Sequence, residues 1–467
     1  MLADLPNRRG LAALVRLVRF ETELRLSGHA ALALMRQPMD ADPAVRQRRS
    51  ELIVSVLGGN DRQASQWLRV YALDLPTGDY SSARWRELIQ RQRQQIDAAS
   101  SAVSTRPSVL ELVRVCATRA ASSEQVPEAL RLARENIDLI PPTSRDLIDA
   151  CSWAIDNQLH PFVLDLQSEH HRMFDNQPIL LYGAAEATKV RGDDAQANQL
   201  AERASRIKPL PENEAKRAEM SPKELEETAQ AHRLLGEKLE QRGLFHWAER
   251  EFRQIIDAME TDSEPAYTAR VRLATMLGEL QRFEEAADVL RPLTERIEKD
   301  DKFKQRLSSV LFQYNRIKSD QEFYAARAMI RDGAVEPAKP LLEHAFRLNP
   351  ENIDILIAMH RLKSDSQWNS LVDLTLRKTI HRVDLEVRSA EMQVRQAGRF
   401  RLANDILGQG LNQYAWLVSN TEGDYQKALE FSLRSLELAP DGPKLDTCAR
   451  CYFALGDYEN AVRMQRR

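Results

Sequence analysis

The sequence is poor in the residues that mark β-rich or disulfide-bonded proteins. Its 467 residues include only 17 glycines, 20 prolines and 4 cysteines. Alternating runs of Val, Ile and Thr bounded by Asn-Gly turns, which predict β-hairpins, are absent. Four cysteines in so long a chain also make no disulfide framework. We therefore predict an all-α fold.

Long apolar runs are missing as well. No stretch approaches the roughly 18 consecutive apolar residues that predict a membrane-spanning helix. Four arginines interrupt residues 1–24, which argues against a secretory signal with an apolar centre: Arg8, Arg9, Arg16 and Arg19. We expect no membrane insertion. The sequence assigns no compartment, and a cytoplasmic location is only the default expectation.

Charge of one sign does not dominate the chain. The net charge is −3 with 29% charged residues, so no global attraction to nucleic acid is expected. Of the 66 basic residues only 14 are lysines, and the first is Lys189. Compositional bias is the simpler interpretation of this imbalance. RNA binding by the arginine-rich N-terminal half is the alternative, and it would require an affinity that falls steeply with salt.

Motifs that carry catalysis are also missing. The sequence has no Gly-rich phosphate loop, no G-x-S-x-G and no H-E-x-x-H. Cys448 and Cys451 form a C-x-x-C, but no second pair or nearby histidine completes a zinc set, so we expect both to pack in the core. We predict a protein that is not an enzyme, with no catalytic residues, no cofactor and no metal.

What the sequence does contain is a spaced pattern of small and bulky residues. In its clearest copy Leu235 and Leu239 share a helix face, and Gly236 beside them leaves room for a second helix. Gly243 suits a left-handed turn that ends the first helix. The second helix then carries an apolar seam formed by Phe245, Ala248, Phe252, Ile255 and Ile256.

The same offsets recur along the chain, which is typical of stacked helical repeats. The steps from Ala117 to Cys151 and from Cys151 to Ala185 are both 34 residues. Prolines at 141, 209, 350 and 440 close several copies. Small residues occupy the slots of further copies at Gly192, Ala197, Ala274, Ala286, Ala326, Gly333, Ala338, Gly423, Ala428, Ala449, Gly456 and Ala461.

This pattern resembles the tetratricopeptide repeat family. The resemblance implies a right-handed α-solenoid of helix-turn-helix repeats, and a scaffold that binds extended peptides or helices along a concave groove. It covers roughly residues 106–209, 223–350 and 409–467.

The resemblance and the breaks between its copies predict six segments. An N-terminal helical region precedes the repeats, and its Asp42-Pro43-Ala44-Val45-Arg46 resembles the signature of HEAT-like repeats. Otherwise these helices cap the stack. The segments are 1–105, the N-terminal region; 106–209, a first array; 210–222, a linker; 223–350, a second array; 351–408, atypical helices; and 409–467, a C-terminal pair whose last repeat is incomplete.

The spacing of the repeat pattern is interrupted in the fifth segment, residues 351–408. We expect one long helix across roughly residues 383–406 that bypasses a half-repeat. Gly408 and Gly410 are expected to end it.

The resemblance also implies a binding surface, formed by first-helix positions that do not pack between helices. The family's clamp for terminal carboxylates is disfavoured, because its asparagines are missing and acidic residues intrude. The candidate partner-binding residues are Tyr182, Glu186, Lys189, Arg233, Glu237, Glu240, Thr275, Phe323 and Arg327.

We therefore predict a non-enzymatic scaffold whose partner is a protein or peptide. The alternative is a regulatory or substrate-recruiting arm of a larger protein, membrane-anchored or exported, which a longer reading frame would select. Self-association through an uncapped C-terminal end is a further expectation.

Overall fold

The computed structural model describes most of the chain after residue 105. The HEAT-like signal and the other predictions for residues 1–105 fall almost entirely outside the described residues. The described residues are 106–122, 125–211, 214–309, 314–397 and 401–466, together with Arg86, Ile89, Gln90, Arg93 and Gln94.

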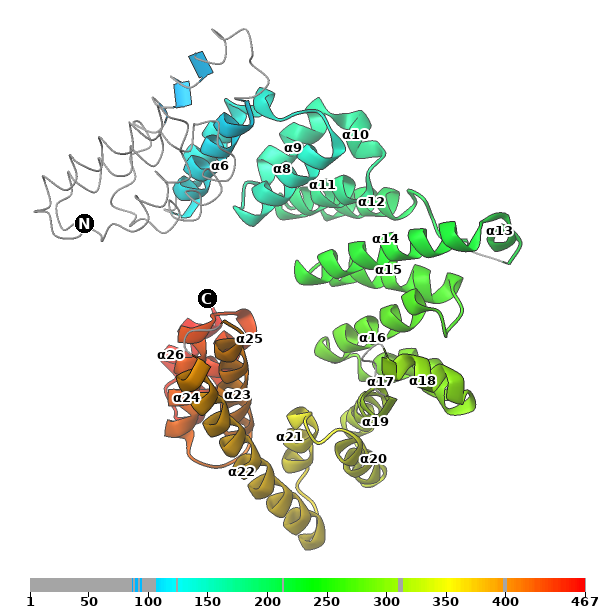
Figure 1. The fold of residues 1–467 in the computed structure, drawn as a ribbon, viewed down its shortest axis with the longest axis vertical. Coiled ribbons are helices and arrows are strands. Elements are labelled where there is room, and N and C mark those ends of the chain that lie inside the picture. The colour runs from blue at the N-terminus through cyan, green and yellow to red at the C-terminus, as the bar shows by residue number, and fades with distance from the viewer. Residues whose placement is uncertain are drawn as a thin grey trace, which may run out of the picture. The chain divides into compact units, whose positions relative to one another are not determined.

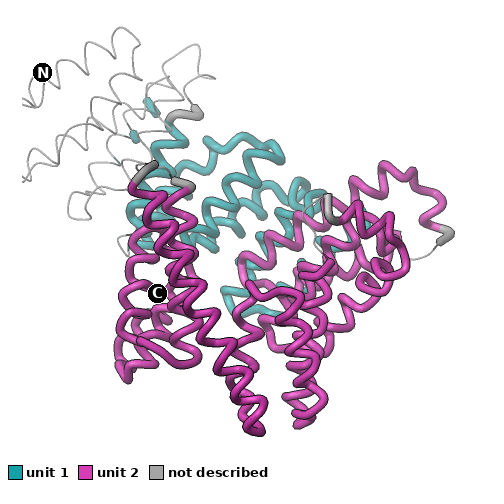
Figure 2. The backbone as a smooth tube through the Cα atoms, turned by 60° about the horizontal axis from the view of Figure 1, so that its bottom comes forward, with its two compact units in different colours: residues 1–209 teal, residues 210–467 magenta. Residues whose placement is uncertain are grey.

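The described chain is all-α, as predicted, with no strand among the described residues. It forms two compact units, residues 1–209 and residues 210–467 (Figure 2). Within each unit consecutive helices form antiparallel hairpins that stack on the next hairpin (Figure 1). Each unit is therefore a segment of an α-solenoid built from helix-turn-helix repeats.

The described part of the first unit contains three hairpins. Short helices α10 (His171–Asp175) and η2 (Ile137–Leu139) lie between them. The paired helices are α6 (Arg106–Ser122) with α7 (Val126–Arg134), α8 (Ser144–Asp156) with α9 (His160–Glu169), and α11 (Pro178–Val190) with α12 (Asp194–Ser205).

The second unit begins with the short helix α13 (Glu214–Glu219) and continues through further hairpins. Helix α18 (Asp301–Ser309) is inserted between two of them, and α21 (Ile353–Arg361) precedes the long α22 (Ser366–Ala397). The paired helices are α14 (Pro222–Gln241) with α15 (Phe245–Ala258), α16 (Glu264–Glu279) with α17 (Phe283–Lys299), α19 (Tyr314–Arg331) with α20 (Val335–Leu348), α23 (Arg401–Asn420) with α24 (Tyr425–Leu438), and α25 (Gly442–Ala454) with α26 (Tyr458–Gln465).

Seven described hairpins turn on one residue in the left-handed region of backbone space. The turn predicted at Gly243 has φ +72°, and equivalent slots elsewhere behave alike. Two of the seven are glutamines, which shows that the slot is set by the repeat and not by glycine alone. The turn residues are Gln158, Gly192, Gly243, Gln281, Gly333, Gly423 and Gly456.

In six of these seven hairpins the residue seven positions before the turn is small, which allows the helices to approach closely; the exception is Trp416, before Gly423. A Cβ on Gly236 would lie 2.7 Å from Cε1 of Phe252 on the paired helix, a distance that real Cβ atoms almost never show. Ala274 and Ala326 occupy the same slot and are fully or almost fully buried. The predicted equivalence of Gly236, Ala274 and Ala326 is therefore confirmed.

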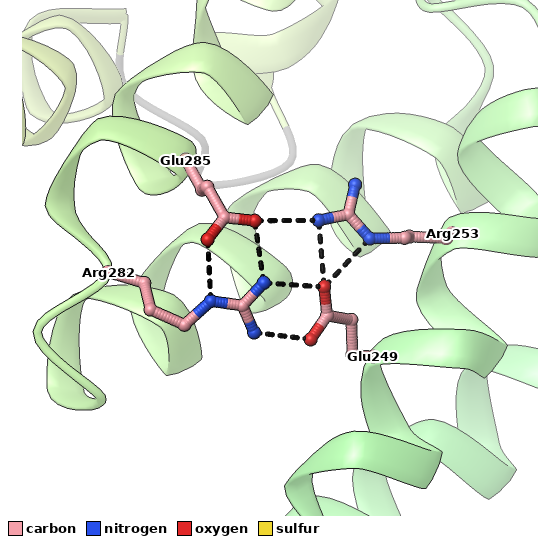
Figure 3. Close-up of polar contacts among 4 residues, drawn as sticks. All are labelled: Glu249, Arg253, Arg282 and Glu285. Atoms are coloured by element: carbon pink, nitrogen blue, oxygen red, sulfur yellow. Dashed lines mark hydrogen bonds and ion pairs between the residues drawn. The ribbon is translucent and has the colours of Figure 1, made fainter.

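Charged side chains on the second helices connect neighbouring repeats (Figure 3). Arg282, at the start of α17, donates to both carboxylate oxygens of Glu249 on α15, at 2.6 and 3.1 Å. It also donates to Glu285, and Arg253 joins both acids to close a ring of four charges. Although burial raises the pKa of Glu249, hydrogen bonds from Arg282 and Arg253 more than offset it and lower that pKa. The ring thus links α15 of one repeat to α17 of the next.

The predicted long helix across residues 383–406 is wrong in its position. The long helix is α22, from Ser366 to Ala397, and Gly408 and Gly410 lie inside α23 instead of ending a helix. Neighbouring helices accommodate both glycines. The Gly408 carbonyl accepts a hydrogen bond from Ser435 Oγ at 2.7 Å, and a Cβ on Gly410 would be 3.4 Å from Val387. Packing here overrides the low helix propensity of glycine.

Gly236, which is crowded by Phe252, and Gly408, which is not crowded, should respond in opposite ways when each is replaced by alanine. Gly236→Ala should lower the free energy of unfolding by about 1–3 kcal/mol, because the new methyl group overlaps the Phe252 ring. Gly408→Ala is the matched control, since its Cβ would lie 3.8 Å from Leu438 in ordinary contact and should stabilise the helix by about 0.5–1 kcal/mol. Urea denaturation measures both. Equal effects would contradict the close approach at Gly236.

Candidate functional site

Polar side chains on α14 and α16 form one charged network. Arg233 pairs with Glu237 one turn along α14. Arg272 of α16 lies 3.9 Å from Glu237 and 3.4 Å from Glu240, which joins the two helices. Burial raises the pKa of Glu240, although Arg272 opposes the shift. Three of the predicted binding residues therefore lie together, on partly buried side chains with restricted freedom.

The network continues from α16 to α19. Tyr324 lies against Gly278 of α16 so closely that a Cβ there would be 2.5 Å from its Cε1. The Tyr324 hydroxyl also lies near Thr275, a predicted site residue that is exposed and whose hydroxyl lowers the pKa of Tyr324 against the larger effect of burial. Asp320, one turn before Tyr324, accepts a hydrogen bond from Asn352 Nδ2 at 3.3 Å. We call these α14, α16 and α19 residues the first-helix surface: Arg233, Glu237, Glu240, Arg272, Thr275, Asp320, Tyr324 and Arg327.

The surface ends in a cluster of three arginines. Arg327 of α19 stacks on Phe283 at 4.6 Å from the ring centroid. Arg361, at the end of α21, donates to Asn420 Oδ1 at 2.5 Å, and Arg450 of α25 donates to the same oxygen at 3.1 Å. Burial, followed by the charge of Arg361, lowers the pKa of both Arg327 and Arg450. Like charges from three helices therefore meet here.

Three predicted site residues belong to α11 in the first unit, and two of them are not on an open surface. Tyr182 is 2% exposed and Glu186 is 9% exposed, whereas Lys189 is exposed. The short helix α10 packs on α11 together with α8, α9 and α12, which leaves few faces of α11 open. The expectation that Tyr182 and Glu186 line an accessible groove is therefore wrong.

Phe323 is also buried. It is 8% exposed and belongs to the core formed by α19, α20 and α21. Its ring lies 5.8 Å from that of Tyr324, and Arg327 lies near its face. The expected role of Phe323 as a contact residue is wrong, and its position supports Arg327 instead.

One group of side chains could hold a metal ion. His360 of α21, Asp373 of α22 and Glu422, in the turn after α23, offer ligand atoms within 4.8 Å of one another. The Nδ1 of His360 is shielded and has no hydrogen-bond partner among the described residues. An imidazole and two carboxylates suit a divalent transition metal. Sequence inspection missed the group because its members come from three separate elements and form no spaced motif.

The C-x-x-C cysteines are placed as expected. Cys448 and Cys451 lie inside α25, are fully buried and form no disulfide. Burial raises the pKa of Cys451 to about 12, so its thiol stays protonated and unreactive at neutral pH. Among the described helices, none combines the length and the apolar composition needed to cross a bilayer.

No family model and no curated protein matches the chain. Solved structures give weak global similarity. The chain aligns with the structure of Naa15/Naa10 bound to HypK-THB at 14% identity and a TM-score of 0.28. The alignment covers 97% of this chain but only 62% of the other, so this chain spans less than two thirds of that protein's length. It aligns with yeast Tom70 at 13% identity and a TM-score of 0.28, covering 98% and 91% of the two chains.

A third solved structure is the human IFIT1 dimer with m7Gppp-AAAA. The alignment has 12% identity and a TM-score of 0.24, and it covers 93% of this chain and 95% of the other. The assignment of the repeat fold therefore rests on the chain's own hairpin geometry.

The buried carboxyl on the first-helix surface gives a pH-dependent prediction. Burial raises the pKa of Asp320 from 3.8 to about 6, so the folded state favours the neutral acid. The contribution of Asp320 to stability should therefore be most favourable below its ordinary pKa and become unfavourable as the pH rises from about 4 to above 6. Asp320→Asn should raise the free energy of unfolding by about 2 kcal/mol at pH 7 and change it little at pH 4. Denaturation at both pH values tests this, and a gain that is the same at each would contradict it.

Proposed function

We propose that the chain is a non-enzymatic scaffold that binds a protein partner on the first-helix surface. The observation that carries this proposal is the continuity of polar side chains across successive repeats. Arg272 connects α14 to α16, Tyr324 connects α16 to α19, and Arg327 leads to the arginine cluster. A surface repeated from hairpin to hairpin suits an extended segment of a partner.

The burial of the surface residues supports the same function. Arg233 and Glu237 have side chains only 18% and 21% exposed and are already paired. Side chains held in this way lose little conformational freedom when a partner binds. Their charges alternate between acid and base, which favours a partner with a complementary pattern over a uniform polyanion.

Photo-crosslinking tests which helix face the partner contacts. A photoreactive phenylalanine analogue is introduced into the full chain at Thr275 of α16 or, as the control, at Glu295 of α17. Both positions are exposed, and they lie on the first and second helices of one hairpin. We expect protein adducts at position 275, and at least fivefold fewer at position 295, measured by mass spectrometry after irradiation in cells.

The opposite distribution would contradict the proposal. Adducts that are equal at both positions would show that the two faces are not distinguished. Adducts at position 295 alone would place the binding surface on the second helices.

A further inference from the structure

The arginine cluster carries charges that no ion pair in the described part of the chain neutralises. Arg327, Arg361 and Arg450 come from α19, α21 and α25, and no ion pair joins any of them to a carboxylate in the described part of the chain. Elsewhere in the same unit most arginines near the surface pair with an acid, as Arg291 does with Asp288 at 2.5 Å. Three unpaired like charges repel one another, so their grouping costs stability that an anionic ligand would recover.

The three side chains are held in place by neutral groups. Asn420 is 6% exposed, and its Nδ2 donates to the Trp416 carbonyl at 3.0 Å, which turns Oδ1 toward Arg361 and Arg450. That single oxygen accepts a hydrogen bond from each of these two arginines. It fixes both guanidinium groups without neutralising either charge.

Two of the arginines stack their guanidinium groups on the faces of aromatic rings. Arg327 lies over Phe283 at 4.6 Å, and Arg450 lies over Phe453 at 5.0 Å. A guanidinium group stacked in this way keeps the N–H donors at its edge available, and those donors match the two oxygens of a carboxylate. The cluster is thus oriented in advance for an anion.

The nearby acids limit the size of the ligand. Asp354 is close enough to act on the pKa of Arg327, but its carboxylate accepts from the Trp416 indole N–H at 2.7 Å. Glu422, in the turn two residues after Asn420, is exposed. A nucleic-acid backbone, with a phosphate at every step, would meet these acids on leaving the cluster. A short peptide segment can place one or two carboxylates at the arginines and neutral residues beside them.

We propose that Arg327, Arg361 and Arg450 form a binding site for an acidic segment of the protein partner, with Asn420 as the residue that positions two of the arginines. The inference rests on the scaffold function proposed above and names the chemistry of the ligand. Arg327 belongs to the surface predicted from the sequence, whereas Arg361 and Arg450 extend it.

The test is fluorescence anisotropy of the full chain with a labelled hexaglutamate peptide, acetylated and amidated so that only side-chain carboxylates are offered. A hexaglutamine peptide and a hexauridylate RNA are the comparison probes. We expect hexaglutamate to bind, with an affinity that falls as salt rises. Hexaglutamine should not bind, and hexauridylate should bind at least tenfold more weakly.

Substitutions locate the binding. Arg361→Gln should weaken hexaglutamate binding about tenfold, because an exposed charge-assisted hydrogen bond is lost, and Arg361→Lys should restore part of it. The triple variant Arg327→Gln, Arg361→Gln, Arg450→Gln should abolish binding. The matched control changes three ion-paired arginines of the same unit, Arg291, Arg347 and Arg382, to glutamine and should bind as the wild type does.

Arg361→Gln decides the outcome even if the triple variant unfolds, because the Arg361 side chain is exposed and removing one of three like charges should not lower the thermal midpoint. The proposal is overturned if hexaglutamate does not bind, if Arg361→Gln binds it with unchanged affinity, or if hexauridylate binds more tightly. Crosslinks at position 275 that persist in any of these cases would leave the scaffold function standing and remove only the acidic ligand.

Discussion

Each repeat depends on a single backbone conformation at the hairpin turn. A residue with positive φ reverses the chain within one peptide unit, so the second helix starts directly beside the end of the first. The reversal fixes which residues face each other across the pair. Gly236 opposes Phe252 in one hairpin, where even a Cβ would overlap the ring, and alanines occupy its slot in several others. Stacking of successive hairpins follows from this register.

The same register leaves the outer positions of the first helices to polar residues. Those residues do not act singly, because several of their contacts join one repeat to the next, as Arg272 joins α16 to α14. The second helices are joined in a parallel way by the ring around Arg282. The proposed binding residues are therefore positioned by contacts between repeats. The arginine cluster departs from this rule, since no ion pair to a carboxylate in the described part of the chain neutralises it.

Much of the repeat architecture could be predicted because its signals are local. The seven-residue step from Gly236 to Gly243 recurs at Ala326 and Gly333, and both are read directly from the sequence. The position of α22 could not be predicted, because Gly408 and Gly410 are accommodated by neighbouring helices that no periodicity reveals.

The candidate site could be predicted only in part, for related reasons. Arg327 and the α14 residues follow from the repeat frame. Tyr182 does not, because the inserted helix α10 adds packing on α11 that the frame does not contain. Arg361 and Arg450 come together only through the fold, since α21 lies outside the repeat frame and Asn420 lies on a third helix.

The most direct measurement compares two glutamine-to-glycine substitutions. Gln281, with φ +60°, occupies a turn slot that is glycine in other repeats, so Gln281→Gly should raise the free energy of unfolding by about 0.5–1 kcal/mol by removing backbone strain. Gln254→Gly, inside α15, should lower it by about 1 kcal/mol. Opposite signs are the predicted result. Destabilisation at both sites would contradict the claim that one left-handed turn defines the seven described hairpins.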